Sequence, residues 1–174
     1  VFVRGKILKA NAPVDPRGGP RRILICEVET DAGRFTVINV HIPRAERAHR
    51  TPREFKPLLD YIMDGVDVRE RKFGQLLSEA PRDVPLVIAG DFNTPPPSRY
   101  YDRMGDRFTD SFAAVGRGFG HTFVWRHRLP VLRIDYVWTG GGVKPLTCTV
   151  RDHHPSDHRP LVVEMALPGP AESE

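Results

Sequence analysis

Hydrophobic and polar positions fall into short patterned segments along most of the chain, and each pattern predicts a secondary-structure element. Residues 2–9, 22–30 and 34–42 are strand-like segments, and the second and third are rich in β-branched side chains, which favour strands. Asp31-Ala32-Gly33 is a turn of hairpin length between the second and third segments. The chain therefore opens with expected antiparallel strands, and the Pro/Gly-rich residues 11–20 are expected to form a loop.

Residues 53–79 show helical spacing, with a break near Gly65. The apolar positions that recur there are Phe55, Leu58, Leu59, Ile62, Met63, Phe73, Leu76 and Leu77. A second, short helix is expected around residues 98–104. The charged residues of the first region are expected to lie on solvated faces; they are Arg50, Arg53, Arg69, Arg71 and Lys72.

The second half of the chain alternates strands with turns. Leu86 to Ala89 form a continuous apolar run, which predicts a strand buried on both faces. Further strands are expected at residues 121–125, 132–139, 143–151 and 159–166. Many short strands with helices grouped between them predict an α/β domain over residues 1–166, followed by a polar tail at 167–174.

Composition narrows the class of protein only slightly. The 174 residues are 40% hydrophobic, enough for one core, and no apolar run is long enough to cross a membrane. The first ten residues lack the apolar stretch of a secretory signal. A net charge of +4 mildly favours polyanionic partners. Cys26 and Cys148 form no C-x-x-C pair and are expected to be buried, reduced thiols. Compartment and oligomeric state stay open.

Polar side chains follow the strand at 86–89. Asp91 and Asn93 are two apart, so an extended chain would project both to one side, and Pro95 to Pro97 prevent the strand from continuing. A carboxylate and an amide together suit a hydrated metal ion or a positioned water. The alternative is an Asx turn that caps the strand.

Three other segments carry polar chemistry at strand positions. Asp135, between Ile134 and Tyr136, needs a partner if buried, either Arg133 or a histidine from elsewhere. His41 ends the strand at 34–42 on the face opposite Ile42; a structural role is the alternative.

The segment Ser156-Asp157-His158 precedes the last strand. Asp157 and His158 are adjacent, so they should point apart and reach two parts of one site, such as a metal and a phosphate.

Taken in order, "NVHIP", "AGDFNTPP", "LRIDYVW" and "SDHRPL" resemble the endonuclease/exonuclease/phosphatase superfamily, which includes DNase I-like nucleases, over about residues 22–166. The resemblance implies a four-layer α/β sandwich of two mostly antiparallel sheets flanked by helices. It also implies a phosphoesterase that uses Mg²⁺, with Mn²⁺ as an alternative, and water as the nucleophile.

Carried over by motif, the resemblance implies that Asp91 and Asn93 orient or deprotonate the attacking water and hold the phosphoryl group. Asp91 and Asp157 would bind the metal. His158 would contact the scissile phosphate or act as base, with Asp135 fixing its tautomer. His41 would be a second histidine, as phosphate clamp or general acid.

The resemblance implies a phosphoester substrate, with DNA or RNA as candidates, for a nuclease or general phosphodiesterase. Asn93, Arg133 and Trp125 are the expected substrate contacts. Trp125 and the adjacent residues 126–128 could grip a duplex. The alternative places Trp125 in the core and residues 126–128 in a solvated turn.

The family's opening strand with an Asn, and its strand ending in Gln-Glu, have no counterpart in this sequence; Glu27 and Glu29 lack that setting. We therefore expect an N-terminally truncated domain, the C-terminal two-thirds, with weak Mg²⁺ affinity. The alternative function is a catalytically impaired fragment or a basic module that binds nucleic acid or protein.

Overall fold

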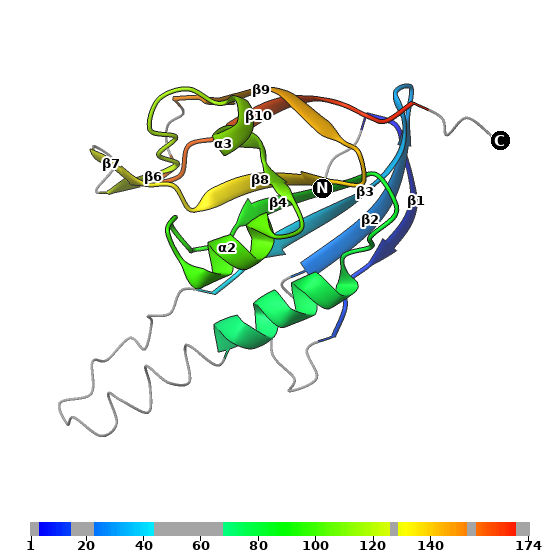
Figure 1. Ribbon diagram of the computed structural model, residues 1–174, viewed down its shortest axis with the longest axis horizontal. Coiled ribbons are helices and arrows are strands. Elements are labelled where there is room, and N and C mark those ends of the chain that lie inside the picture. Colours follow the sequence, from blue (N-terminus) through cyan, green and yellow to red (C-terminus); the bar gives the residue numbers. More distant parts are fainter. Residues whose placement is uncertain (1–3, 15–22, 44–67, 126–128, 153–155, 170–174) are drawn as a thin grey trace.

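A six-stranded sheet forms the centre of the computed structural model, which describes residues 4–14, 23–43, 68–125, 129–152 and 156–169. Its strand order is β1-β2-β3-β4-β8-β5 (Figure 1). The bounds are β1 Lys6–Asn11, β2 Ile23–Thr30, β3 Gly33–His41, β4 Leu86–Asp91, β5 Thr109–Asp110 and β8 Asp135–Gly140. The predicted hairpin between β2 and β3 is confirmed, since Gly33 turns with φ 125°.

All pairs in this sheet are antiparallel except β3 and β4, which run parallel. Two smaller antiparallel sheets accompany it, β6 (Phe123–Trp125) with β7 (Leu129–Leu132) and β9 (Lys144–Val150) with β10 (Leu161–Ala166). Both β9 and β10 contact β8. The predicted α/β class with mostly antiparallel pairing is confirmed.

The prediction of one strand over residues 132–139 is wrong. β7 ends at Leu132 and β8 begins at Asp135. The backbone N–H groups of Ile134 and Asp135 donate to the hydroxyl of Thr122, both at 3.1 Å, so a side chain replaces the strand ladder at this break.

Three helical segments lie beside the sheet. Residues 68–79 are helical, which confirms the end of the predicted helix; its residues 53–67 lie outside the described ranges. The predicted short helix is α2 (Arg99–Gly105), whose N-cap Ser98 accepts the Tyr101 N–H. The sequence did not predict α3 (Ser111–Val115), which begins at the N-cap Asp110.

One face of the sheet packs on helix 68–79 and α2, which lie in front of it in Figure 1. Leu86 and Ile88 of β4 are fully buried and Val87 is 6% exposed, as predicted for a strand buried on both faces. The side chains that form the largest part of this core are Ile38, Ile42, Phe73, Leu76, Phe92, Met104, Tyr136 and Trp138.

The prediction that the charged residues of the first helix lie on solvated faces is wrong for two of them. Arg69 is 7% and Lys72 is 3% exposed. Their polar ends bind within the fold, Arg69 to the carbonyls of Pro43 and Asn93 and Lys72 to Gln75 Oε1. Arg50 and Arg53 lie outside the described residues.

Both cysteines are buried and reduced, as predicted, Cys26 in β2 and Cys148 in β9. Within the described ranges, no helix is both long and apolar enough to cross a membrane. Residues 167–169 have no regular structure, and the remainder of the predicted tail lies outside the described residues.

Candidate active site

Three neighbouring strands bring their polar residues to the same end of the sheet. The register pairs His41 at the end of β3 with Asp91 at the end of β4, and Asp91 with Asp135 at the start of β8. Because β3 and β4 are parallel while β8 runs back, two strand ends and one strand start meet there. Three residues far apart in the sequence thus lie side by side.

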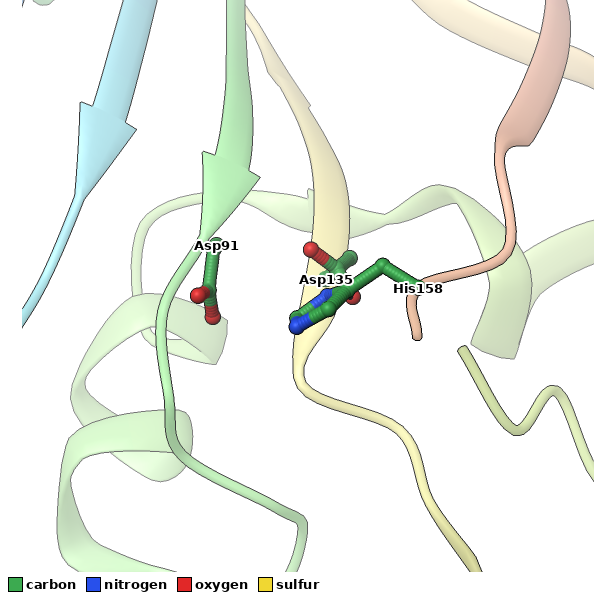
Figure 2. Close-up of side chains that lie close together, drawn as sticks. All are labelled: Asp91, Asp135 and His158. Atoms are coloured by element: carbon green, nitrogen blue, oxygen red, sulfur yellow. The ribbon is translucent and has the colours of Figure 1, made fainter. Parts of the chain in front are cut away.

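Among the described residues, Asp91, Asp135 and His158 form a cluster of side chains that can bind metal ions. One ligand atom from each lies within 4.8 Å of those of the others. Figure 2 shows His158 reaching from the segment before β10 across to Asp135, while Asp91 faces the pair from β4. The structure therefore brings residues from three of the polar segments together at one place, as expected.

The His158 ring has a defined orientation. Its Nδ1 lies 2.8 Å from Asp135 Oδ2, and an ionised carboxylate can only accept, so Nδ1 carries a proton. The other ring nitrogen points toward Asp91 in Figure 2. Asp135 thus has the histidine partner that the sequence offered as an alternative to Arg133.

Residues 122–124, at the start of β6, bind the chain on both sides of His158. The Val124 N–H donates to the Asp157 carbonyl at 2.8 Å, and the Arg159 N–H donates to the Thr122 carbonyl at 2.7 Å. The Phe123 ring meets the His158 ring edge-on at 5.5 Å. Backbone bonds on both sides of His158 therefore fix its place beside β8.

Asp91 and Asn93 share a turn. The Asn93 N–H donates to Asp91 Oδ1, and its Nδ2 donates to Asp91 Oδ2, both at 2.8 Å. The chain does not stay extended, since Asn93 has φ 47°. The Asx-turn alternative is thus the observed local geometry, and it also fixes both carboxylate oxygens of Asp91 near the cluster.

Gly90 allows the strand to approach its neighbour at this point. With φ +144°, a Cβ there would lie 2.0 Å from the Val40 carbonyl oxygen. Only glycine fits so close to β3, and this approach places Asp91 next to His41.

Burial raises the pKa of the Asp91 carboxyl above its ordinary value. The nearby Asp135 carboxylate acts in the same direction, whereas the Asn93 N–H opposes it. A cation placed between the two carboxylates would favour the ionised form of Asp91.

His41 lies at the rim of the cluster. Its Nε2 is 3.9 Å from Asp91 Oδ2, and its side chain is 59% exposed. Ile42 points the other way into the core and is fully buried, which confirms the predicted alternation.

The other expected site residues lie outside the cluster. Asp157 is exposed. Arg133 is bound to Asp110 through a buried ion pair, and its side chain is 10% exposed. Trp125 is 51% exposed, so the alternative that packs it in the core is wrong; residues 126–128 lie outside the described ranges.

Two supporting residues were missed by sequence reasoning. Arg69 donates to the carbonyls of Pro43 at 3.1 Å and Asn93 at 3.0 Å and also binds the Thr94 hydroxyl. Thr122, fully buried, accepts the two N–H groups that precede β8. Neither has a local sequence signal, because each acts on backbone groups far away in the chain.

The cluster opens onto solvent through a hollow of about 370 Å³. Asp135, His158, Arg159 and Pro160 are among its lining residues. Asp135 and His158 at its wall, together with the neighbouring Asp91, could hold a divalent cation that keeps several waters, since such ions need few protein ligands.

Comparisons with known proteins agree with this arrangement. A model of the Endonuclease/Exonuclease/phosphatase family matches residues 8–158. Exodeoxyribonuclease III of Haemophilus influenzae is 30% identical over 92 residues, which are 52% of this chain and 31% of that protein. The chain thus spans about a third of the length of this curated relative.

Solved structures share the fold. An AP endonuclease from Archaeoglobus fulgidus has TM-score 0.71 and 16% identity, covering 94% of this chain and 72% of that one. An endonuclease/exonuclease/phosphatase from Beutenbergia cavernae has TM-score 0.68 and 22% identity, covering 95% and 46%. These matches confirm the predicted sandwich fold. By the family match over most of its length, the chain belongs to the endonuclease/exonuclease/phosphatase family.

Proposed function

We propose that this chain is the catalytic region of a metal-dependent phosphodiesterase that hydrolyses nucleic acid by attack of water. The observation that carries the proposal is the His158–Asp135 pair at 2.8 Å, which lines a solvent-open hollow and has Asp91 within 4.8 Å of it. Relatives named exodeoxyribonuclease III and AP endonuclease support DNA as the substrate class.

Each residue of the cluster has a part in this proposal. With Asp135 holding the proton on Nδ1, the Nε2 atom of His158 takes a proton from water or contacts the scissile phosphate. Asp91 orients the attacking water and would hold the cation. Asp157, which lies outside the cluster, would help to bind the cation directly or through a water. Asn93 holds the turn that aims Asp91 and contacts the phosphoryl group.

His41 would act at the rim as phosphate clamp or as acid for the leaving oxygen, because its exposed ring is 3.9 Å from Asp91. Mg²⁺, or Mn²⁺ in its place, would supply charge neutralisation at the non-bridging phosphate oxygens. Asp91 and Asp135 provide the oxygen donors that such hard cations prefer. Arg133 and Trp125 remain proposed substrate contacts.

The test is hydrolysis of bis-p-nitrophenyl phosphate and of a duplex with an abasic site, each with Mg²⁺ and with EDTA. Asp91→Ala should remove most turnover, and EDTA should do the same. Asp83→Ala is the matched control, since Asp83 is exposed in the turn at the opposite end of β4. Turnover that survives both EDTA and Asp91→Ala would contradict the proposal. Salt-sensitive DNA binding without turnover would favour a binding module instead.

A further inference from the structure

Residues 116–121 form a loop that only glycines allow. A Cβ at Gly116 would lie 2.6 Å from the Phe112 side chain, and one at Gly120 would lie 2.4 Å from the same ring. Gly118 and Gly120 both have positive φ, at +82° and +66°. The backbone therefore wraps closely around Phe112, and its shape is set by packing against that ring.

This loop presents an aromatic ring to solvent. Phe119 is 87% exposed. Its ring stacks on that of His121, with centroids 5.6 Å apart and planes 19° from parallel. Packing does not require Phe119, because almost none of its surface is buried. An accessible ring face on a loop of fixed shape is a surface on which another flat ring can stack.

The stacked pair is joined directly to the candidate active site. His121 precedes Thr122, which binds the backbone at the start of β8, and Phe123, which contacts His158. In Figure 1, α3, β6 and β7 lie at the end of the sheet where β8 begins. A ligand that contacts His121 is therefore close to the cluster.

A second hollow, of about 450 Å³, lies under the pair. Its lining includes Phe119, His121, Leu132 and Arg133, together with Pro95 and Pro96. Those prolines follow Asn93, and Arg133 lies just before Asp135. Arg133 thus lines this hollow, and Asp135, two residues further along the chain, lines the hollow that contains His158.

We propose that Phe119 and His121 form a stacking platform for an unpaired nucleobase of the nucleic-acid strand whose phosphodiester lies at the Asp91–Asp135–His158 cluster. The inference rests on the proposed function. Stacking needs an accessible ring face, which Phe119 has, and every base offers a matching face. Exposed Arg117 in the same loop supplies positive charge for the adjacent phosphate, in keeping with the chain's net charge of +4.

The test measures binding without hydrolysis. A labelled single-stranded oligonucleotide is titrated in EDTA and followed by fluorescence anisotropy, next to a strand of equal length whose bases are replaced by tetrahydrofuran. Phe119→Ala should weaken binding of the base-containing strand about 5- to 150-fold. Phe119→Trp should restore it, and the tetrahydrofuran strand should bind wild type and Phe119→Ala equally.

Leu146→Ala is the matched control, because Leu146 is a 59% exposed apolar residue on β9. It should leave both affinities unchanged. Equal affinity of wild type and Phe119→Ala for the base-containing strand would overturn the platform, as would an equal loss on both strands. If Phe119→Ala instead abolished self-association in sedimentation and left DNA binding intact, Phe119 would be a contact between copies of the chain.

The readout separates this inference from the proposed function. Binding is measured without metal, so base-dependent binding can be seen in a protein that shows no turnover. Conversely, an active protein whose Phe119→Ala variant binds the base-containing strand normally overturns the platform alone.

Discussion

The two faces of the central sheet are made from alternate residues of the same strands and differ in what they do. On the helix side, Ile38, Ile88 and Trp138 are at most 1% exposed. On the opposite side, at the strand ends, the side chains of Asp91 and Asp135 are both 21% exposed. At this end of the sheet, a buried face and a partly exposed face, here called the dry face and the wet face, thus lie one residue apart. Further along β4 the second side is buried as well, since Val87 is 6% exposed.

This difference shows how the fold holds its chemistry. Asp91 is followed by Phe92, which is 2% exposed, and Asp135 by Tyr136, also 2% exposed. The Tyr136 hydroxyl donates to the Thr94 carbonyl at 2.7 Å, tying β8 to the turn after β4. Each polar residue of the cluster is therefore positioned by a buried neighbour, and the two roles should be separable by mutation.

The largest expected effect is a loss of stability from a mutation on the dry face. Phe92→Ala should lower the free energy of unfolding by about 3–5 kcal/mol, because it leaves a cavity between Phe73 and Tyr136. Asp91→Asn, one residue away, should change it by less than about 1.5 kcal/mol. Urea unfolding followed by circular dichroism measures both. Similar losses in the two variants would mean that the faces are not independent.

The next largest expected effect is a loss of activity, without a loss of stability, from a mutation on the wet face. Asp135→Asn should lower phosphodiester hydrolysis by about 100- to 1000-fold, since the neutral amide no longer favours His158 protonated at Nδ1. The unfolding transition should stay near that of wild type. Asp83→Asn, an exposed matched substitution, should keep full activity. Activity within twofold of wild type would remove Asp135 from the proposed mechanism.

Much of this arrangement could be predicted from alternation and motif. The apolar run at 86–89 predicts strand β4, and the polar residues that follow it predict the place of Asp91. Because Ile42 is buried in the core, alternation predicts that His41 points to the opposite side. The partner of Asp135 stayed open between Arg133 and a histidine, because pairing across distant segments is set by the tertiary fold. Arg133 proved to be bound to Asp110 instead.

Other features were out of reach of local patterns. Arg69 looks like one more charge on a helix, and only the fold places it against the carbonyls of Pro43 and Asn93. The break at residues 133–134 was missed because apolar alternation continues through it. The hydroxyl of Thr122, which lies just before β6, binds the backbone at that break, so no pattern within residues 132–139 could reveal it.

A smaller effect tests how the wet face is anchored. Thr122→Val should lower the free energy of unfolding by about 1–3 kcal/mol, because the buried N–H groups of Ile134 and Asp135 lose their acceptor. Hydrolysis should fall as well, since Asp135 begins β8 at this bond. Thr122→Ser keeps the hydroxyl and should recover most of both. If the serine variant is as impaired as the valine one, the methyl group and not the hydrogen bond is what matters.

The smallest effect concerns the charge on Asp91 itself. Its carboxyl has a pKa raised above 3.8, chiefly by burial, so the folded protein holds this proton more tightly than the unfolded chain does. Stability contributed by the protonated form is therefore lost as the pH rises from the ordinary pKa through the raised one. Asp91→Asn cannot titrate. The substitution also removes a hydrogen bond between residue 91 and Asn93, which changes the free energy of unfolding by an amount that does not depend on pH.

In EDTA, the stability of Asp91→Asn relative to wild type should therefore increase as the pH rises from about 4 and level off above the raised pKa. Thermal melts of the two proteins across this range measure the difference. Added Mg²⁺ should reduce it, because a cation beside Asp91 stabilises the ionised carboxylate that burial and Asp135 disfavour. Two stability curves that stay parallel with pH would mean that Asp91 is as well solvated as an ordinary surface carboxyl. The wet face would then be open water at Asp91 and not a half-buried binding site.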